Sequence, residues 1–386
     1  MKKIFKYALL FFAACTISFS LVACGDDKND PDPTPTPNIP TDDTAADIDY
    51  NSAYAEQWAN YMVTVSGLLK EDAQTLYDEW NNGYAETFKN HNSTEYGSAI
   101  DCVNQIFDGC VDIAGEVGSS KIGEPYDLYV AGKTTEALYA VESWYSWHSR
   151  DDYRNNIYSI RNAYYGSRDG SINANSLSAV LAAKNKELDA RAKALIKAAA
   201  DAIYAIPQPF RNNINSKETV AAMDACAELG DFIDEELKSY FGENINDDAT
   251  LDPVIKQYVD AVVLPTYKDL AQKNAALDTA VRAFKNNPSD DAFAKCADAW
   301  LTAREPWESS EAFLFGPVDE LGLDPNMDSW PLDQAQIAQI LNSQDFTNLN
   351  WKDGDTDDKI EAAQNLRGFH TLEFLIFKDG KARTVK

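Results

Sequence analysis

The chain has 386 residues, with 62 acidic against 34 basic side chains and a formal net charge of −28 at pH 7. This charge makes nucleic acids and anionic lipid head groups poor partners, so we expect neither as a ligand. The length is sufficient for two domains, each with its own core.

The first 23 residues are typical of an export signal. Basic residues precede an apolar run from Tyr7 to Leu21, which is short for a helix that spans a bilayer. The run ends in Leu21-Val22-Ala23-Cys24, which resembles the lipobox of bacterial lipoproteins. We therefore expect removal of residues 1–23 and acylation of Cys24. The alternative is an ordinary secretory signal with a chance cysteine.

Residues 24–47 are predicted to form an acidic tether that begins at the lipidated Cys24. The stretch is rich in Pro, Thr and Asp, too polar to bury and stiffened by proline. The acidic residues directly after Cys24 resemble a surface-export signal of bacterial lipoproteins. The sequence thus predicts an outer-membrane lipoprotein, facing the periplasm or the cell exterior, that contacts the membrane through its lipid alone.

The remaining cysteines indicate structural roles. None of them forms a Cys-x-x-Cys pair, the spacing typical of zinc or redox sites. Cys102 and Cys110 would lie about 12 Å apart on one helix, which is too far for a disulfide between them.

Helical periodicity dominates the rest of the chain. A helix is predicted over the run from Leu177 to Ile206, ended by Pro207. Its apolar residues repeat every seven positions, at Leu181, Leu188, Leu195 and Ala202.

Two later helices have strong start signals. Asp252-Pro253 predicts a helix that buries Ile255, Tyr258, Val259 and Val262 before Pro265. Pro288-Ser289-Asp290-Asp291 predicts a second, with Phe293, Cys296, Trp300 and Arg304 at helical spacing.

No mature segment alternates apolar and polar residues long enough to require a sheet, so we predict an all-α fold of two packed four-helix bundles. Residues 48–250 would form one bundle domain and residues 251–386 the other. The division is placed in the Gly242–Asp252 stretch, where Gly, Asn and Asp accumulate.

The segment from Gly368 to Phe377 is the most informative for chemistry. His370 and Glu373, three residues apart, would project from one helix face and could bind one metal ion or hydrogen-bond each other. A buried histidine satisfied by its neighbouring acid is the purely structural interpretation. Gly368 would allow a close approach of backbone or ligand.

The supply of histidines limits the choice of metal. Only three occur in the chain, so any metal must be held mostly by oxygen. Iron fits such ligands best, calcium and zinc fit less well, and a metal-free protein remains an alternative.

Gly368, His370 and Glu373 resemble the Gly-x-His-x-x-Glu signature of the imelysin-like proteins, filed as peptidase family M75. The stretches Trp300–Pro317 and Asp328–Asp333 resemble two further signatures of that family. A fourth stretch, Glu142–Ile157, resembles the Ser/Asp/Asn-rich element of the family's other half. Its alternative interpretation is a capped polar loop that leads into a helix.

The order of these signatures departs from the family pattern. Gly-x-His-x-x-Glu usually lies in the first half of a member, whereas here it lies near the C-terminus. The resemblance thus implies a circular permutation, which is tolerated where the old termini are close together at the surface.

The resemblance implies two related helical bundles with shared polar residues at their interface, and a link to iron uptake. Our leading hypothesis is a lipid-anchored, non-catalytic protein that binds a metal ion or metal chelate, with uptake-system proteins as partners. The expected metal ligands are His370, Glu373, Glu308 and Glu311. The expected ligand-binding residues are Arg304, which would neutralise or clamp an anionic chelator, and Trp330, Ser146, Asp152 and Asn156.

Two other functions stay open. A metallopeptidase would use His370 as a ligand and a glutamate to activate a metal-bound water. A surface glycan-binding protein would use its tryptophans as stacking platforms, although simple core packing also explains those side chains.

Overall fold

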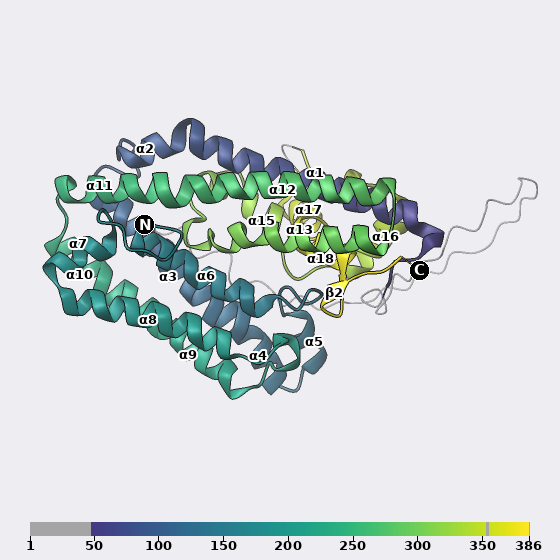
Figure 1. Ribbon diagram of the computed structural model, residues 1–386, viewed down its shortest axis with the longest axis horizontal. Coiled ribbons are helices and arrows are strands. Elements are labelled where there is room, and N and C mark those ends of the chain that lie inside the picture. The colour runs from purple at the N-terminus through teal and green to yellow at the C-terminus, as the bar shows by residue number, and fades with distance from the viewer. Residues whose placement is uncertain (1–47, 353–354, 386) are drawn as a thin grey trace, which may run out of the picture. The chain divides into compact units, whose positions relative to one another are not determined.

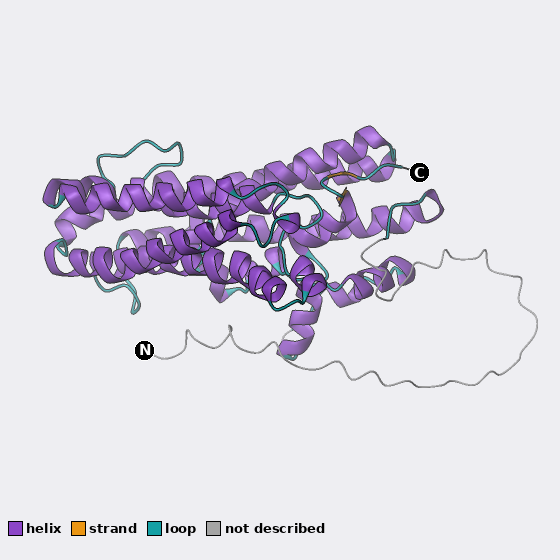
Figure 2. Ribbon diagram, turned by 90° about the horizontal axis from the view of Figure 1, so that it is seen from below, coloured by secondary structure: helices purple, strands orange, loops and turns teal. Residues whose placement is uncertain are grey.

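The computed structural model describes residues 48–352 and 355–385, and Figure 1 and Figure 2 show that helices make up nearly all of them. The predicted all-α fold class is thus confirmed. The strands in this part of the chain are β1 (Phe377–Lys378) and β2 (Lys381–Ala382), which pair antiparallel as a short hairpin. The predicted signal, lipidated Cys24 and tether lie outside the described residues.

One group of four helices contains the Gly-x-His-x-x-Glu segment. The long helix α1 (Ala55–Glu79) packs against α12 (Leu264–Asn286), and α12 packs on α13 (Asp290–Glu308). Helix α18 (Gly368–Ile376) lies against both α1 and α13. The motif is therefore held on a buried helix in the middle of this group.

A second group of four helices comes from the intervening sequence. It consists of α3 (Ala99–Gly115), α6 (Ser149–Tyr165), α8 (Lys186–Ala205) and α9 (Lys217–Phe232). Helix α9 packs on α3 and α8, and α6 packs on α3 and α8. In Figure 1 this group lies below the layer of α1, α12 and α13.

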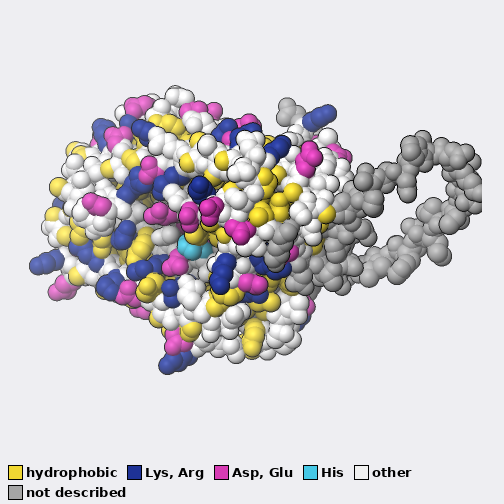
Figure 3. Space-filling view, turned by 45° about the vertical axis from the view of Figure 1, so that its right-hand side comes forward, with side chains coloured by type: hydrophobic (Ala, Val, Ile, Leu, Met, Phe, Trp, Pro, Cys, Tyr) yellow, Lys and Arg dark blue, Asp and Glu magenta, His cyan; other side chains and the backbone are white. Residues whose placement is uncertain are grey.

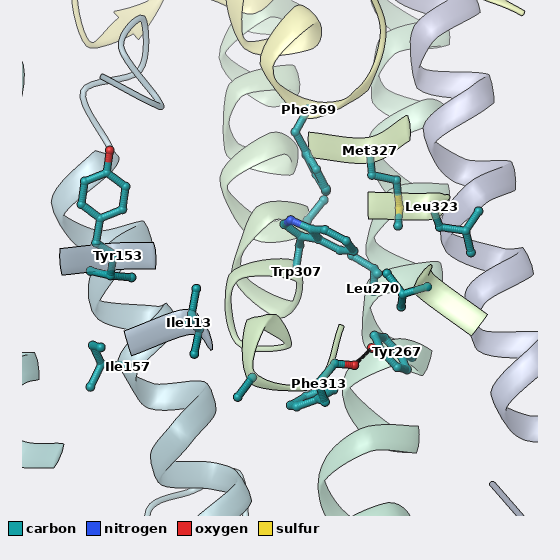
Figure 4. Packing of buried hydrophobic residues seen from close by; sticks show 14 of the residues in the cluster. Ile113, Tyr153, Ile157, Tyr267, Leu270, Trp307, Phe313, Leu323, Met327 and Phe369 are labelled. Atoms are coloured by element: carbon teal, nitrogen blue, oxygen red, sulfur yellow. Dashed lines mark hydrogen bonds between the residues drawn. The ribbon is translucent and has the colours of Figure 1, made fainter. Parts of the chain in front are cut away.

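The two groups meet along α6 and α13 and around the 3₁₀ turn Glu311–Phe313. Figure 4 shows apolar side chains from both groups near this junction, and the Tyr267 hydroxyl donates to the Phe313 carbonyl at 2.8 Å. Gly109 of α3 makes the close approach possible, because a Cβ there would lie 2.2 Å from the Ala312 carbonyl oxygen. The turn thereby brings the end of α13 against α3 and α6.

The helix that carries Arg304 begins where its sequence predicts. The Ser289 hydroxyl accepts a hydrogen bond from the Ala292 amide, which caps the first turn of α13. The apolar positions expected on this helix are fully buried, and Arg304 is buried with them. Packing along one face thus directs Arg304 inward.

Two other predicted helices differ in detail. Helix α11 (Asp248–Tyr258) begins one turn before Asp252, because the Asp247 side chain caps it and Pro253 lies inside the helix. The run from Leu177 is split into α7 (Leu177–Lys184) and α8, because Asn185 accepts from the Leu188 amide and starts a new helix.

The shorter helices connect these groups. They are α2 (Ala85–Lys89), α4 (Glu124–Val130), α5 (Thr134–Tyr139), α10 (Ser239–Asn244), α14 (Pro317–Glu320), α15 (Leu323–Asp328), α16 (Gln334–Ser343) and α17 (Asp357–Gln364). The π-helical segments are Trp80–Tyr84, Glu116–Gly123, Ile233–Lys238 and Val259–Val263. No helix in the described ranges combines the length and apolar character needed to cross a bilayer.

The described residues lie in one compact unit. Helix α1 precedes the predicted division at Gly242–Asp252, yet it packs on α12, which follows that division. Division into two domains and the exchanged order of the halves stay predictions. The four described cysteines are buried and unpaired, in agreement with the roles expected for them.

Candidate functional site

Gly368 places the start of α18 directly against the end of α15. Its φ of +84° lies in the left-handed region, and a Cβ there would lie 2.4 Å from the Met327 carbonyl oxygen. Only glycine fits both the backbone conformation and the close approach. The contact brings Asp328, at the end of α15, to His370 on the first turn of α18.

His370 is held between two carboxylates. Its Nδ1 lies 3.2 Å from Glu373 Oε2 and its Nε2 lies 3.1 Å from Asp328 Oδ1, and the side chain has no exposed surface. Burial and the nearby Arg304 guanidinium oppose protonation, but Asp328 and Glu373 outweigh them and raise the pKa of His370 to about 9. The Trp330 ring packs edge-on, with its centroid 4.8 Å from that of the imidazole.

The second oxygen of Glu373 fixes the loop before α6. Glu373 Oε1 accepts from the Tyr145 amide at 3.1 Å, and from the Ser146 amide and hydroxyl, each at 2.7 Å. The carboxylate therefore joins α18 to the loop that leads into the second helix group. With His370 on Oε2, both oxygens of Glu373 are engaged in the structure.

Arg304 neutralises several carboxylates at once. Its guanidinium pairs with Asp328, lies 2.6 Å from Glu308 Oε1 and has its Nε 3.9 Å from Asp152 Oδ2. These carboxylates outweigh the effect of burial and raise the pKa of Arg304 well above its usual value. Since Arg304 has no exposed surface, it neutralises internal charge and is not available at the surface to clamp a chelator.

Helix α6 contributes two polar side chains to the same region. Asn156 Nδ2 donates to Glu308 Oε2 at 2.6 Å, whereas its Oδ1 is buried and accepts no hydrogen bond from the part of the chain that the structure describes. Asp152 accepts from Ser143 at 2.5 Å and lies 2.7 Å from His148 Nδ1. Burial opposes ionisation of Asp152, but His148 and Arg304 outweigh it and lower its pKa.

Glu308, Glu311 and Asp328 each offer one oxygen within 4.8 Å of the others, close enough to share a metal ion. Burial raises the pKa of Glu308 to about 8 and that of Glu311 well above its usual value. The pKa of Asp328 is instead lowered, because Arg304 and His370 outweigh burial. We refer to these three residues as the carboxylate cluster.

A buried lysine lies beside the carboxylate cluster. Lys121 Nζ is 3.7 Å from Glu311 Oε1 and 3.2 Å from both oxygens of Glu142. Burial opposes the charge of Lys121, but the surrounding glutamates outweigh it and raise its pKa.

Asp324 is a further buried acid in this region. Burial and the charge of Asp328 raise its pKa to about 7. Acidic groups thus outnumber cations in this region.

The structure brings together the residues that the sequence singled out from four segments. These residues are Arg304, Glu308, Glu311, Trp330, His370, Glu373, Ser146, Asp152 and Asn156. Of the four predicted metal ligands, Glu308 and Glu311 lie in the carboxylate cluster, whereas His370 and Glu373 pair with each other beside it. The ligand roles themselves stay predictions.

Sequence reasoning missed two participants. Asp328 lies in a stretch noted for its family resemblance, and its position before Trp330 could have identified it. Lys121 lies in the π-helical segment Glu116–Gly123, where no motif marks it. The place of Lys121 beside the carboxylate cluster is evident only from the tertiary structure.

Comparisons with known proteins identify the family of this chain. The family model described as imelysin, of the peptidase M75 group, matches residues 29–234 and 263–386. A solved structure from Bacteroides ovatus, described as an imelysin peptidase, is 62% identical, covers 89% of this chain and 100% of its own, and superposes with a TM-score of 0.88. This chain belongs to the imelysin family.

A curated relative from Synechococcus elongatus, named iron-regulated protein A, is 31% identical over 124 residues. The match covers 32% of this chain and 31% of the relative. The chain therefore spans about a third of the length of that relative.

Proposed function

We propose that this protein binds iron as a cargo ion and delivers it to an uptake system, without catalysis. The observation that carries the proposal is the carboxylate cluster of Glu308, Glu311 and Asp328, whose oxygens lie within 4.8 Å of one another. The name of the Synechococcus elongatus relative, iron-regulated protein A, supports iron as the cargo. Uptake-system proteins would be the partners.

The ligand chemistry fits iron. Three carboxylate oxygens form a hard ligand set, which suits ferric or ferrous iron and calcium better than zinc. The unpartnered Oδ1 of Asn156 gives a further oxygen beside Glu308. His370 would not bind the ion itself. Its Nε2 would orient the Asp328 carboxylate that does.

The proposal also rests on the charge of the region. Two carboxylic acids with raised pKa values stand next to an ionised Asp328. A bound cation would stabilise all three in the ionised form and would release protons on binding. The positive charges of Arg304 and Lys121 would neutralise the negative charge that remains after the ion has bound.

A metallopeptidase has weaker support, although the similar Bacteroides ovatus structure is described as a peptidase. A catalytic metal needs an open position and a substrate that reaches it. The metal ligand of that mechanism would be His370, but both of its nitrogens are already paired with carboxylates, and neither His370 nor Glu373 has exposed surface for a peptide substrate to reach. A glycan-binding function has even less support than a metallopeptidase, because Trp300 and Trp307 are fully buried and cannot stack on a sugar.

For location, we propose an outer-membrane lipoprotein anchored through Cys24, exposed to the periplasm or at the cell surface. The support is the sequence pattern of residues 1–47. Incorporation of radioactive palmitate tests it: the wild-type protein should be labelled and the C24A variant should not. A labelled C24A variant, or an unlabelled wild type, would contradict the lipid anchor.

Isothermal titration calorimetry of the purified protein tests the iron proposal. We expect binding of ferrous iron under anaerobic conditions and of ferric iron supplied as its nitrilotriacetate complex, with weaker binding of calcium and zinc. The E308Q/E311Q variant should lose iron binding. The control is Glu305→Gln on the same helix, because the Glu305 side chain is 64% exposed and forms a surface ion pair with Lys273 at 3.5 Å.

Two results would reject the proposal. Iron binding that is equal in E308Q/E311Q and Glu305→Gln would place the ion elsewhere. Cleavage of a denatured protein by the wild type, lost in both His370→Ala and Glu373→Ala, would support the peptidase instead.

A further inference from the structure

A groove of about 620 Å³ runs between α6 and α8. Its arginines on α6 lie roughly on the opposite side of that helix from Asn156, which bonds to Glu308 of the carboxylate cluster. The charged lining residues of the groove on α6 are Arg154 and Arg161, and those on α8 are Lys193, Lys197 and Asp201. Four basic side chains thus accompany one acid, in a chain whose net charge is −28. The volume falls in the range of about 300–1,000 Å³ that is typical of small-molecule sites.

Stacking on tyrosines fixes the two arginines. The guanidinium of Arg154 lies 4.3 Å from the Tyr204 ring centroid and 4.9 Å from that of Tyr158. Arg161 lies 4.1 Å from the Tyr158 centroid, so Tyr158 separates the two arginines. Stacking covers the faces of a guanidinium and leaves its edge for hydrogen bonds, so little side-chain entropy remains to be lost on binding.

These two arginines also have no acidic partner within residues 48–352 and 355–385. Lys193 pairs with Asp189 at 2.6 Å and Lys197 pairs with Asp201, so their charges are largely compensated. Among the described residues, neither Arg154 nor Arg161 forms an ion pair with a carboxylate, and the Nε of Arg154 is buried without a hydrogen-bond partner. Arg161 donates only to the Asn162 amide oxygen.

The spacing of the arginines defines the ligand. Arg154 and Arg161 are two helical turns apart on α6. Their guanidinium carbons lie 4.9 Å and 4.1 Å from the same Tyr158 ring centroid, so they are at most about 9 Å apart. Guanidinium groups bind carboxylates through paired hydrogen bonds. A ligand that contacts both must therefore carry at least two carboxylates and be small enough to fit between the two guanidinium groups. The acidic surroundings disfavour a long polyanion, which would extend beyond the groove.

We propose that this groove binds a small polycarboxylate anion. Where the proposed iron function also holds, the anion is the chelator that carries ferric iron to the protein. The sequence assigned a chelator to Arg304, but that guanidinium is buried and paired with Asp328 and Glu308. Helix α6 then presents Arg154 and Arg161 to the chelator and Asn156, on its other face, to the ion site.

Calorimetry of the full mature protein with sodium citrate and with ferric citrate tests the groove. We expect both probes to bind, and binding to weaken as the salt concentration rises. The R154Q/R161Q variant should raise the dissociation constant for citrate at least tenfold. The control R191Q/K217Q removes the same charge at exposed positions away from the groove and should bind like the wild type. Melting temperatures report whether each variant is folded.

The outcomes separate the two proposals. Citrate binding that survives in E308Q/E311Q but is lost in R154Q/R161Q supports the groove even if no iron binds to the carboxylate cluster. Absence of citrate binding to the wild type overturns the groove. Equal binding by R154Q/R161Q and R191Q/K217Q overturns it as well, because the effect would then be one of net charge alone.

Discussion

Replacement of Arg304 by glutamine should destabilise the protein strongly. The guanidinium is the shared partner of Asp328 and Glu308, with Asp152 at 3.9 Å, and all four side chains are almost fully buried. Glutamine keeps much of the volume but removes the charge. The carboxylates are then left without their main cation in a region of low dielectric constant.

The expected cost is about 3–5 kcal/mol, the usual cost of removing one partner of a buried ion pair. At about 2.1 cal/mol/K per residue over roughly 340 folded residues, this loss lowers Tm by about 4–7 °C. Arg191→Gln is the matched control, because Arg191 and Glu236 are 50% and 43% exposed. That exposed pair should contribute less than about 1 kcal/mol.

Scanning calorimetry and urea unfolding measure both variants. A second change, Asp328→Asn, should cost less in the R304Q background than in the wild type, because the unpaired carboxylate is already destabilising there. If Arg304→Gln melts like Arg191→Gln, or if the two changes are additive, the buried network does not stabilise the fold as we describe.

Gly368→Ala should cost about 2–3 kcal/mol in urea unfolding, because the φ is +84° and the new Cβ would meet the Met327 carbonyl; a neutral change would contradict the close approach. Ser146→Ala should cost about 1–3 kcal/mol by the same assay, because it removes one of the hydrogen-bond donors to the buried Glu373 side chain. The pKa of His148 is raised from 6.5 to about 9, because a buried aspartate outweighs the effect of burial. The protonated imidazole therefore stabilises the fold fully below pH 6.5, and this stabilisation is lost as the pH rises through 9. The stability advantage of the wild type over His148→Gln should shrink between about pH 6 and pH 10, and a constant difference would show that the imidazole does not titrate as inferred.

The sequence predicted local features well. Ser289 caps α13 as expected, and the helical spacing that follows it buries Arg304. The pairing of His370 with Glu373 follows from three-residue spacing on one helix. In these cases the information lies within one or two turns of the chain.

Features that depend on distant segments were not predictable. Asp328 reaches His370 only because Gly368 allows α18 to approach the end of α15. The partners of Arg304 were uncertain for the same reason, and the sequence alone assigned it to a chelator. At Asn185 a local cap interrupts an otherwise continuous helical pattern, because its side chain satisfies the first amides of α8.

The most direct test of the central claim is anomalous diffraction at the iron absorption edge from crystals loaded anaerobically with ferrous iron. We predict a peak bonded to oxygens of Glu308, Glu311 and Asp328, with His370 still hydrogen-bonded to Asp328. A peak coordinated by His370 and Glu373 instead, or no peak at the carboxylate cluster in a fully iron-loaded crystal, would contradict the account.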